Sequence, residues 1–241
     1  MIKEAMQYIA GLANKEIKEV GGQMFSTGAL NVIEEQTTST LKVNTLSALV
    51  TYLKENYDQL QPIMVHVVDE TEVRVLSGFN RDNRRNILLQ AVAKLPSISF
   101  ERFMDMESFN ILLQSCFVEN LDRAAILKIV GNVHEETVSS FRDDGVSQQV
   151  VAKNGVANVE KVEVPNPVSL KPFRTFIDIT QPTCSFVFRM QSGSDSGSGP
   201  KAALFEADGG AWKLQAMASV KEYLHVELSK EVESGFVTII A

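Results

Sequence analysis

Residues 136–164 read ETVSSFRDDGVSQQVVAKNGVANVEKVEV, and this stretch decides the fold class. Apolar and β-branched residues alternate in it with polar ones, which is typical of β-strands that bury one face. A DDG triplet at 143–145 and an NG pair at 154–155 separate its three runs. Such short links form tight turns, and tight turns connect only antiparallel strands. The stretch therefore predicts an antiparallel β-meander.

Further helices and strands are predicted on both sides of this meander. Apolar residues at helical spacing predict four helices: from Thr45, placed as the N-cap, to Pro62; from Asn80 or Asp82 to Pro96; from Asp105 to Val118; and from Ala211 to Ser229. Other strand-like runs lie at 62–68, 72–79, 124–133, 173–179, 184–190, 201–207 and 235–241. The predicted class is α+β: an antiparallel meander and sheet with packed helices, an N-terminal helical part, and a C-terminal helix followed by a final strand.

The length of 241 residues is enough for one large domain or two small ones. Residues 1–44 mix a short amphipathic stretch, a glycine pair and a polar segment, so we expect an N-terminal arm there. Residues 45–241 are expected to form a single α+β domain, with a candidate sub-boundary near residue 120.

Composition restricts the compartment and the partners. The net charge of -7 argues against a protein that coats nucleic acid by charge alone. Cys116 and Cys184 are flanked by apolar residues, which predicts buried free thiols in a reducing compartment. No stretch has the pattern of a signal peptide or the length of a membrane span, so we expect a cytoplasmic protein with no membrane partner.

The strand-to-helix turn FEADGGAWK at 205–213 is the candidate binding site. Glycines at a helix N-terminus leave backbone N–H groups free to hold an anion, and Lys213 adds a positive charge. The candidate ligand-binding residues are therefore Asp208, Gly209, Gly210 and Lys213. A purely structural interpretation is favoured, in which Asp208 caps the helix and the glycines make a tight turn.

A metal-dependent nuclease is a weaker alternative at the same turn. Glu206 and Asp208 could hold a divalent ion near Lys213, but Glu160 and Lys161 are adjacent in sequence and point to opposite faces of a strand. The three histidines lie in separate elements without metal-ligand spacing. We therefore predict no catalytic residue, no metal site and no cofactor.

Aromatic and arginine residues interleave in the last third of the chain. Arg174 and Arg189 lie among phenylalanines that could stack on nucleic-acid bases. Phe186 and Phe188 are two residues apart, so both are expected to face one core while the arginines point outward.

Three segments carry a resemblance to known proteins: VPNPVSLKPFRTFIDITQP at 164–182, FVFRM at 186–190 and ALFEADGGAWKL at 203–214. From about Leu41 onward, the chain resembles uncharacterised proteins encoded by prophages and tailed phages of bacteria. The resemblance implies a phage gene product made inside a bacterial cell, and it brings no catalytic residues.

The expected function is that of a non-enzymatic phage or prophage protein. Its partners are expected to be further copies of itself, or a host or phage macromolecule, since a chain rich in β-strands must cover its sheet edges. The alternative is a protein that binds a phosphate-bearing ligand or nucleic acid, or a metal-dependent nuclease, through the turn from Asp208 to Lys213.

Overall fold

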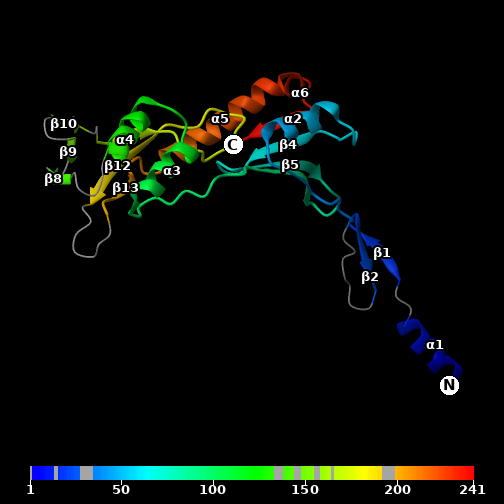
Figure 1. Ribbon diagram of the computed structural model, residues 1–241. Coiled ribbons are helices and arrows are strands. Elements are labelled where there is room, and N and C mark those ends of the chain that lie inside the picture. The colour runs from blue at the N-terminus through cyan, green and yellow to red at the C-terminus, as the bar shows by residue number, and fades with distance from the viewer. Residues whose placement is uncertain are drawn as a thin grey trace.

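The computed structural model describes residues 2–13, 16–27, 35–132, 138–143, 148–154, 158–163, 166–191 and 199–241. The molecule is elongated, with two lobes side by side and an N-terminal extension that projects from one of them (Figure 1). Antiparallel sheets and packed helices confirm the α+β class.

The lobe next to the extension is built on a five-stranded sheet, which we call the five-stranded lobe. Its strand order is β14-β4-β5-β6-β3. The strands are β3 (Leu41–Val43), β4 (Ile63–Val67), β5 (Glu72–Phe79), β6 (Arg85–Val92) and β14 (Val237–Ile240). β4 and β5 form the predicted antiparallel hairpin, whereas β14 and β3 join the sheet in parallel with β4 and β6.

Helix α2 (Leu46–Glu55) covers this sheet with Leu46, Leu49, Val50 and Leu53. The hydroxyl of Thr45 accepts a hydrogen bond from the N–H of Ala48 at 3.2 Å, which confirms the predicted N-cap. The helix ends earlier than predicted, because Asn56 adopts the left-handed conformation (φ 42°) well before Pro62.

The prediction of a helix between Asn80 and Pro96 is wrong, because this segment contains strand β6. Burial alternates from one residue to the next in the most buried part of β6: Leu89 and Ala91 are fully buried, and Gln90 between them is not. The carboxamide oxygen of Asn80 accepts from the N–H groups of Asp82 and Arg84, so Asn80 shapes a hairpin turn instead of capping a helix.

The four-stranded lobe contains a sheet of order β11-β12-β13-β7. The strands are β7 (Met104–Asp105), β11 (Val168–Leu170), β12 (Cys184–Gln191) and β13 (Lys201–Glu206), and the helices packed with them are α3 (Met106–Cys116) and α4 (Leu121–Asn132). The predictions of α3, β12 and β13 are confirmed. The side chain of Asp105 caps α3 by accepting from the N–H of Ser108 at 2.9 Å.

Two strand predictions in this lobe are wrong. Residues 124–133 were expected to form a strand, but 124–132 belong to helix α4, whose Ile126, Ile129 and Val130 reach the core at helical spacing. Residues 173–179 form an irregular loop. The side chain of Gln181 satisfies the backbone of that loop, which explains why the loop needs no partner strand.

The predicted meander is confirmed as a separate three-stranded antiparallel sheet of order β10-β9-β8. Its strands are β8 (Val138–Asp143), β9 (Gln148–Asn154) and β10 (Asn158–Glu163). Most of the predicted turn residues at 143–145 and 154–155 lie outside the described residues, since 144–147 and 155–157 are not described.

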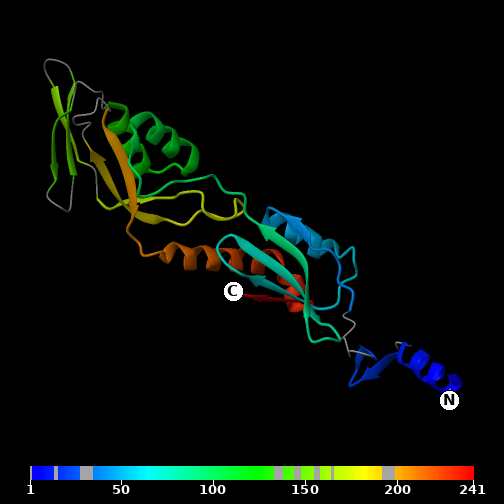
Figure 2. The same ribbon diagram turned by 90° about the horizontal axis from the view of Figure 1, so that it is seen from below.

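One helix joins the two lobes. Helix α5 (Ala211–Glu227) places Trp212 and Ala216 in the core of the four-stranded lobe, and Val220 and Leu224 in the core of the five-stranded lobe. It runs from one lobe to the other in Figure 2. The short helix α6 (Ser229–Glu233) and the predicted final strand β14 follow. The two cores are therefore coupled through one continuous helix.

The N-terminal extension consists of helix α1 (Ile2–Ala13) and a hairpin of strands β1 (Ile17–Val20) and β2 (Gln23–Ser26). We call the described residues of 2–27 the arm. Gly21 and Gly22 both have positive φ values (61° and 80°), as a two-residue hairpin turn requires. Strand β3 falls within the predicted arm of residues 1–44, yet it pairs with β6.

Candidate functional site

The predicted site residues lie in the turn between β13 and α5. Gly209 and Gly210 have φ values of 61° and 81°, and Gly210 is the N-cap of α5. The N–H of Gly210 donates to Oδ1 of Asp208 at 3.0 Å. The side chain of Asp208 thus shapes the turn that precedes the helix. The structural interpretation had expected Asp208 to cap the helix, and this is wrong, because Gly210 is the N-cap and no side chain caps the first turn.

Lys213 is turned toward the other lobe. Its ammonium lies 3.4 Å from a carboxylate oxygen of Glu70, which belongs to the turn between β4 and β5. The side chain of Lys213 is 56% exposed and that of Glu70 is 18% exposed, so the lysine end of this ion pair is in contact with water. The positive charge expected for an anionic ligand is therefore matched by a carboxylate within the chain.

Sequence reasoning missed the residue around which the site is built, Arg174. It was expected to point outward, but its side chain is only 7% exposed, and Nη2 donates to a carboxylate oxygen of Glu206 at 2.6 Å. Its guanidinium carbon lies 4.3, 5.2 and 4.7 Å from the ring centroids of Phe100, Phe186 and Trp212. Aromatic faces attract a guanidinium, which makes this burial tolerable.

Three buried polar atoms near this arginine have no hydrogen-bond partner among the described residues: Nη1 of Arg174, Oδ2 of Asp208 and Nε1 of Trp212. Two are donors and one is an acceptor. Such groups are costly unless a small polar molecule satisfies them. They are a feature of the interior and are not open to a ligand as large as a nucleotide.

The thiol of Cys184 borders the same cluster. Burial raises the pKa of Cys184 to about 12, Arg174 opposes this rise, and Asp208 and Glu206 add to it. The thiol therefore stays protonated at neutral pH, which does not suit a nucleophile. Both cysteines are free and buried, which confirms that part of the prediction.

The loop that carries Arg174 also contacts the five-stranded lobe. The hydroxyl of Thr175 donates to the backbone oxygen of Glu70 at 2.5 Å. Phe176, in the same loop, is fully buried in the core of the five-stranded lobe. One loop therefore contacts both lobes, through Arg174 in the four-stranded lobe and Phe176 in the five-stranded lobe. The residues around the predicted site form a junction between the two lobes.

The junction between the lobes contains both cationic and acidic side chains. Its two cations, Arg174 and Lys213, are each paired with a carboxylate, and Asp208 adds a further acidic group. Within the described part of the chain, no three His, Cys, Asp or Glu side chains gather in a group that could hold a metal ion. Of the histidines, His134 lies outside the described residues.

An open groove of about 600 Å³ runs beside α5, between this helix and the end of the Arg174 loop. Its lining includes Gln215, Ala218 and Glu222 from the helix, and Asp178 from the loop. The carboxylate of Asp178 already accepts from the N–H groups of Leu46 and Ser47, so it holds the start of α2. Of the side chains that line the groove, that of Asp178 is therefore already engaged within the chain.

Comparisons with models of protein families, with curated proteins and with solved structures found no match to this chain. The resemblance to phage and prophage proteins therefore stays a prediction. Among the described residues, no helix is both long and apolar enough to span a membrane.

Proposed function

We propose that this chain is a non-enzymatic protein that assembles with further copies of itself through its N-terminal arm. The phage or prophage setting implied by the resemblance is part of the proposal. The observation that carries it is the arm itself, which extends away from both lobes in two perpendicular views (Figures 1 and 2).

The arm has secondary structure but lacks the size to stabilise it. Helix α1 has 12 residues, and each strand of the hairpin has four. In water, isolated helices of about 12 residues and two-stranded hairpins are marginally stable at best. An element of this kind is ordered when it packs against a surface that its own chain does not supply, which favours an intermolecular partner.

Apolar side chains of the arm face water in the single chain. Ile2, Tyr8, Ile17 and Val20 are 80%, 70%, 60% and 62% exposed. Burying apolar area stabilises an association by about 25 cal/mol for each Å² removed from water. Exposed apolar side chains gathered on one small projection are typical of an interaction surface.

The assembly proposal is tested by comparing the full chain with a variant that lacks residues 1–34. The truncation keeps Glu35, which accepts from the N–H of Arg81 and donates its own N–H to Asp82, and it leaves both cores intact. We expect a discrete oligomer for the full chain and a monomer with unchanged circular dichroism for the variant, by light scattering and native mass spectrometry. A monomeric full chain would refute self-assembly. An oligomeric variant would place the interface outside the arm.

A further inference from the structure

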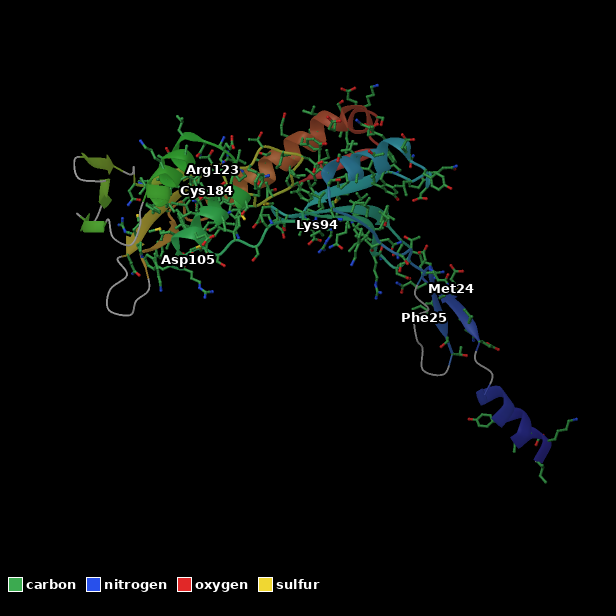
Figure 3. The ribbon with its side chains drawn as sticks, in the orientation of Figure 1. Met24, Phe25, Lys94, Asp105, Arg123 and Cys184 are labelled. Atoms are coloured by element: carbon green, nitrogen blue, oxygen red, sulfur yellow. The ribbon has the colours of Figure 1, made fainter. Side chains whose placement is uncertain are left out.

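We propose that the open groove beside α5 binds a cationic segment of another protein, with a lysine or arginine of that segment at the carboxylate of Glu222. The groove is a surface separate from the arm. Figure 3 shows Met24 and Phe25 of the arm at a distance from α5, which lies along the upper border of the molecule. This inference goes beyond the proposed function and does not depend on assembly of the chain.

The groove has the size of a site for a short peptide segment. Its volume of about 600 Å³ lies within the range of about 300–1,000 Å³ that is usual for ligand pockets. Helix α5 supplies one wall, and Asp178, Ile179 and Thr180 at the end of the Arg174 loop supply the other. The groove can therefore accept a few side chains of a partner.

The outer face of α5 extends the groove at both ends. Residues spaced by four lie on one face of a helix, and Leu214, Ala218, Glu222 and Val226 have this spacing. Ala218 and Glu222 line the groove, while Leu214 and Val226 are 74% and 62% exposed. The helix rises about 18 Å from Leu214 to Val226, the length of about five or six extended residues. An extended segment with apolar residues on both sides of a central cation therefore matches this face.

The charge of the lining selects a cation. The charged side chains of the lining are the carboxylates of Asp178 and Glu222, since the lining contains no lysine, arginine or histidine. Burial raises the pKa of Tyr223, and the negative charges of Asp178 and Glu227 add to the rise. A phosphate group would meet like charges here, which disfavours nucleic acid. A basic protein suits this groove better than a further copy of this chain, whose net charge is -7.

Glu222 is the carboxylate that remains available for a partner. Asp178 already holds the start of α2, and Glu227 pairs with Lys54 at 3.1 Å. Within the described part of the chain, no hydrogen bond or ion pair involves the side chain of Glu222. A cation that docks at Glu222 therefore gains a charge-assisted hydrogen bond without displacing an internal partner.

Neutral side chains of the groove can pair with the backbone of the docked segment. The hydroxyls of Thr180 and Ser219 and the carboxamide of Gln215 line the groove. None of these three side chains has a hydrogen-bond partner among the residues that the structure describes. Hydroxyls and carboxamides both donate and accept hydrogen bonds, as the N–H and C=O groups of an extended segment require.

Peptide binding tests this inference on the full chain. The probes are capped peptides of about five residues, with a central lysine between varied apolar residues. The matched peptides carry an acetylated lysine, which removes the charge and keeps the apolar stem. In calorimetric titrations, we expect the lysine peptides to bind at least about fivefold more tightly than the acetylated ones. The affinity should fall as the salt concentration rises.

Substitutions in the groove locate the binding. Glu222→Gln should remove the preference for lysine over acetylated lysine, and Glu222→Lys should reverse it in favour of peptides with a central glutamate. Ala218→Arg, at an exposed helical position, fills the groove with a cation and should prevent binding. The matched control is Glu233→Gln, which removes the same charge from an exposed position on α6 and should leave binding unchanged. Circular dichroism checks the fold of each variant.

Three outcomes would overturn the inference. The first is equal affinity for the lysine and acetylated peptides, and the second is a loss in Glu233→Gln as large as that in Glu222→Gln. The third is that no lysine peptide binds at concentrations up to about 1 mM. None of these outcomes bears on the proposed assembly, which is measured separately by the deletion of residues 1–34.

Discussion

The guanidinium carbon of Arg174 lies 4.7 Å from the ring centroid of Trp212, so a loop between two strands is fixed to the first turn of α5. The same arginine is paired with Glu206, at the end of the strand that leads to this helix. The contact explains why the turn from Asp208 to Lys213 has a defined shape, and it makes Arg174 a determinant of stability at the junction between lobes.

Removal of this arginine should be costly. Arg174→Ala is expected to lower the free energy of unfolding by about 2 kcal/mol, which is less than for a fully buried pair because Glu206 keeps contact with water. Urea denaturation gives the value. Arg189→Ala, a change on β12 in the same lobe, is the control and should cost less. Equal losses for both variants would show that the pair with Glu206 is unimportant.

Because α5 belongs to both cores, the lobes should unfold together. Leu224→Ala removes a fully buried side chain from the five-stranded lobe and should cost about 2–5 kcal/mol. The single tryptophan, Trp212, lies in the core of the other lobe. In Leu224→Ala, the unfolding transition reported by Trp212 fluorescence should nevertheless move to a lower denaturant concentration, together with the transition reported by circular dichroism.

The control for coupled unfolding is Val226→Ala, an exposed position on the same helix, which should change stability by less than about 0.5 kcal/mol. Two separate transitions, with Trp212 fluorescence unaffected by Leu224→Ala, would contradict coupling between the lobes.

Alkaline pH should destabilise the fold through Tyr52. Burial raises the pKa of Tyr52 from 10.0 to about 12, and its hydrogen bond to Asp58 adds to the rise. Between these two pH values the unfolded chain loses the phenolic proton while the folded chain keeps it, so stability falls as pH rises from 10 to 12. Tyr52→Phe should make this fall shallower in denaturation experiments. Tyr57→Phe, at an exposed position, should leave the fall unchanged.

Gly210 is the glycine of the predicted site where a side chain should be most strained. Its φ of 81° disfavours any residue with a Cβ atom, although open space surrounds the position. Gly210→Ala should therefore lower stability by about 1–2 kcal/mol in thermal unfolding. Gly78→Ala, where φ is not positive and space is also open, is the control. A neutral Gly210→Ala would indicate that the turn relaxes easily.

Lys213 separates the assembly proposal from the phosphate-ligand alternative. Lys213→Ala should cost at most about 1 kcal/mol, since the lysine end of its pair with Glu70 is in contact with water, and it should leave the oligomer intact. A thermal-shift panel of nucleotides and divalent metals provides the comparison. Stabilisation of the natural chain that disappears in Lys213→Ala would support a ligand at the turn instead.

Sequence reasoning succeeded where local periodicity and final burial agree. The stripe of Trp212, Ala216, Val220 and Leu224 predicted α5 because each of these residues is buried in one of the cores. The alternation in β12 predicted a strand because one of its faces is fully covered. In such segments the pattern of apolar residues is a direct record of what the fold buries.

Short apolar runs misled the prediction in both directions. The Ile87–Leu89 run fits a helix or a strand, and the hairpin turn shaped by Asn80 decides for a strand. In 124–132, three β-branched residues favoured a strand, yet the side chain of Asn120 accepts from the N–H of Arg123 and starts a helix. Tertiary packing overrides weak propensities in segments of this kind.

The candidate site was only partly predictable. The glycine turn was visible in the sequence because paired glycines before a helical pattern have few other uses. Arg174 was not, since no local pattern distinguishes an arginine held by three aromatic rings from one in water. Phe100 and Trp212 are far from it in sequence, and only the folded chain brings them together.

The direction of the arm has a consequence for valency. In a pair of chains joined at their arms, the lobes of both chains stay uncovered, because each arm extends away from the lobes of its own chain. Every remaining contact surface, including the groove beside α5, would then be presented twice by one particle. A target that binds one chain weakly would bind the joined pair more tightly, since the second contact forms at a high effective concentration once the first is made. The pair would act as a bivalent unit, able to bridge targets or to crosslink into larger arrays.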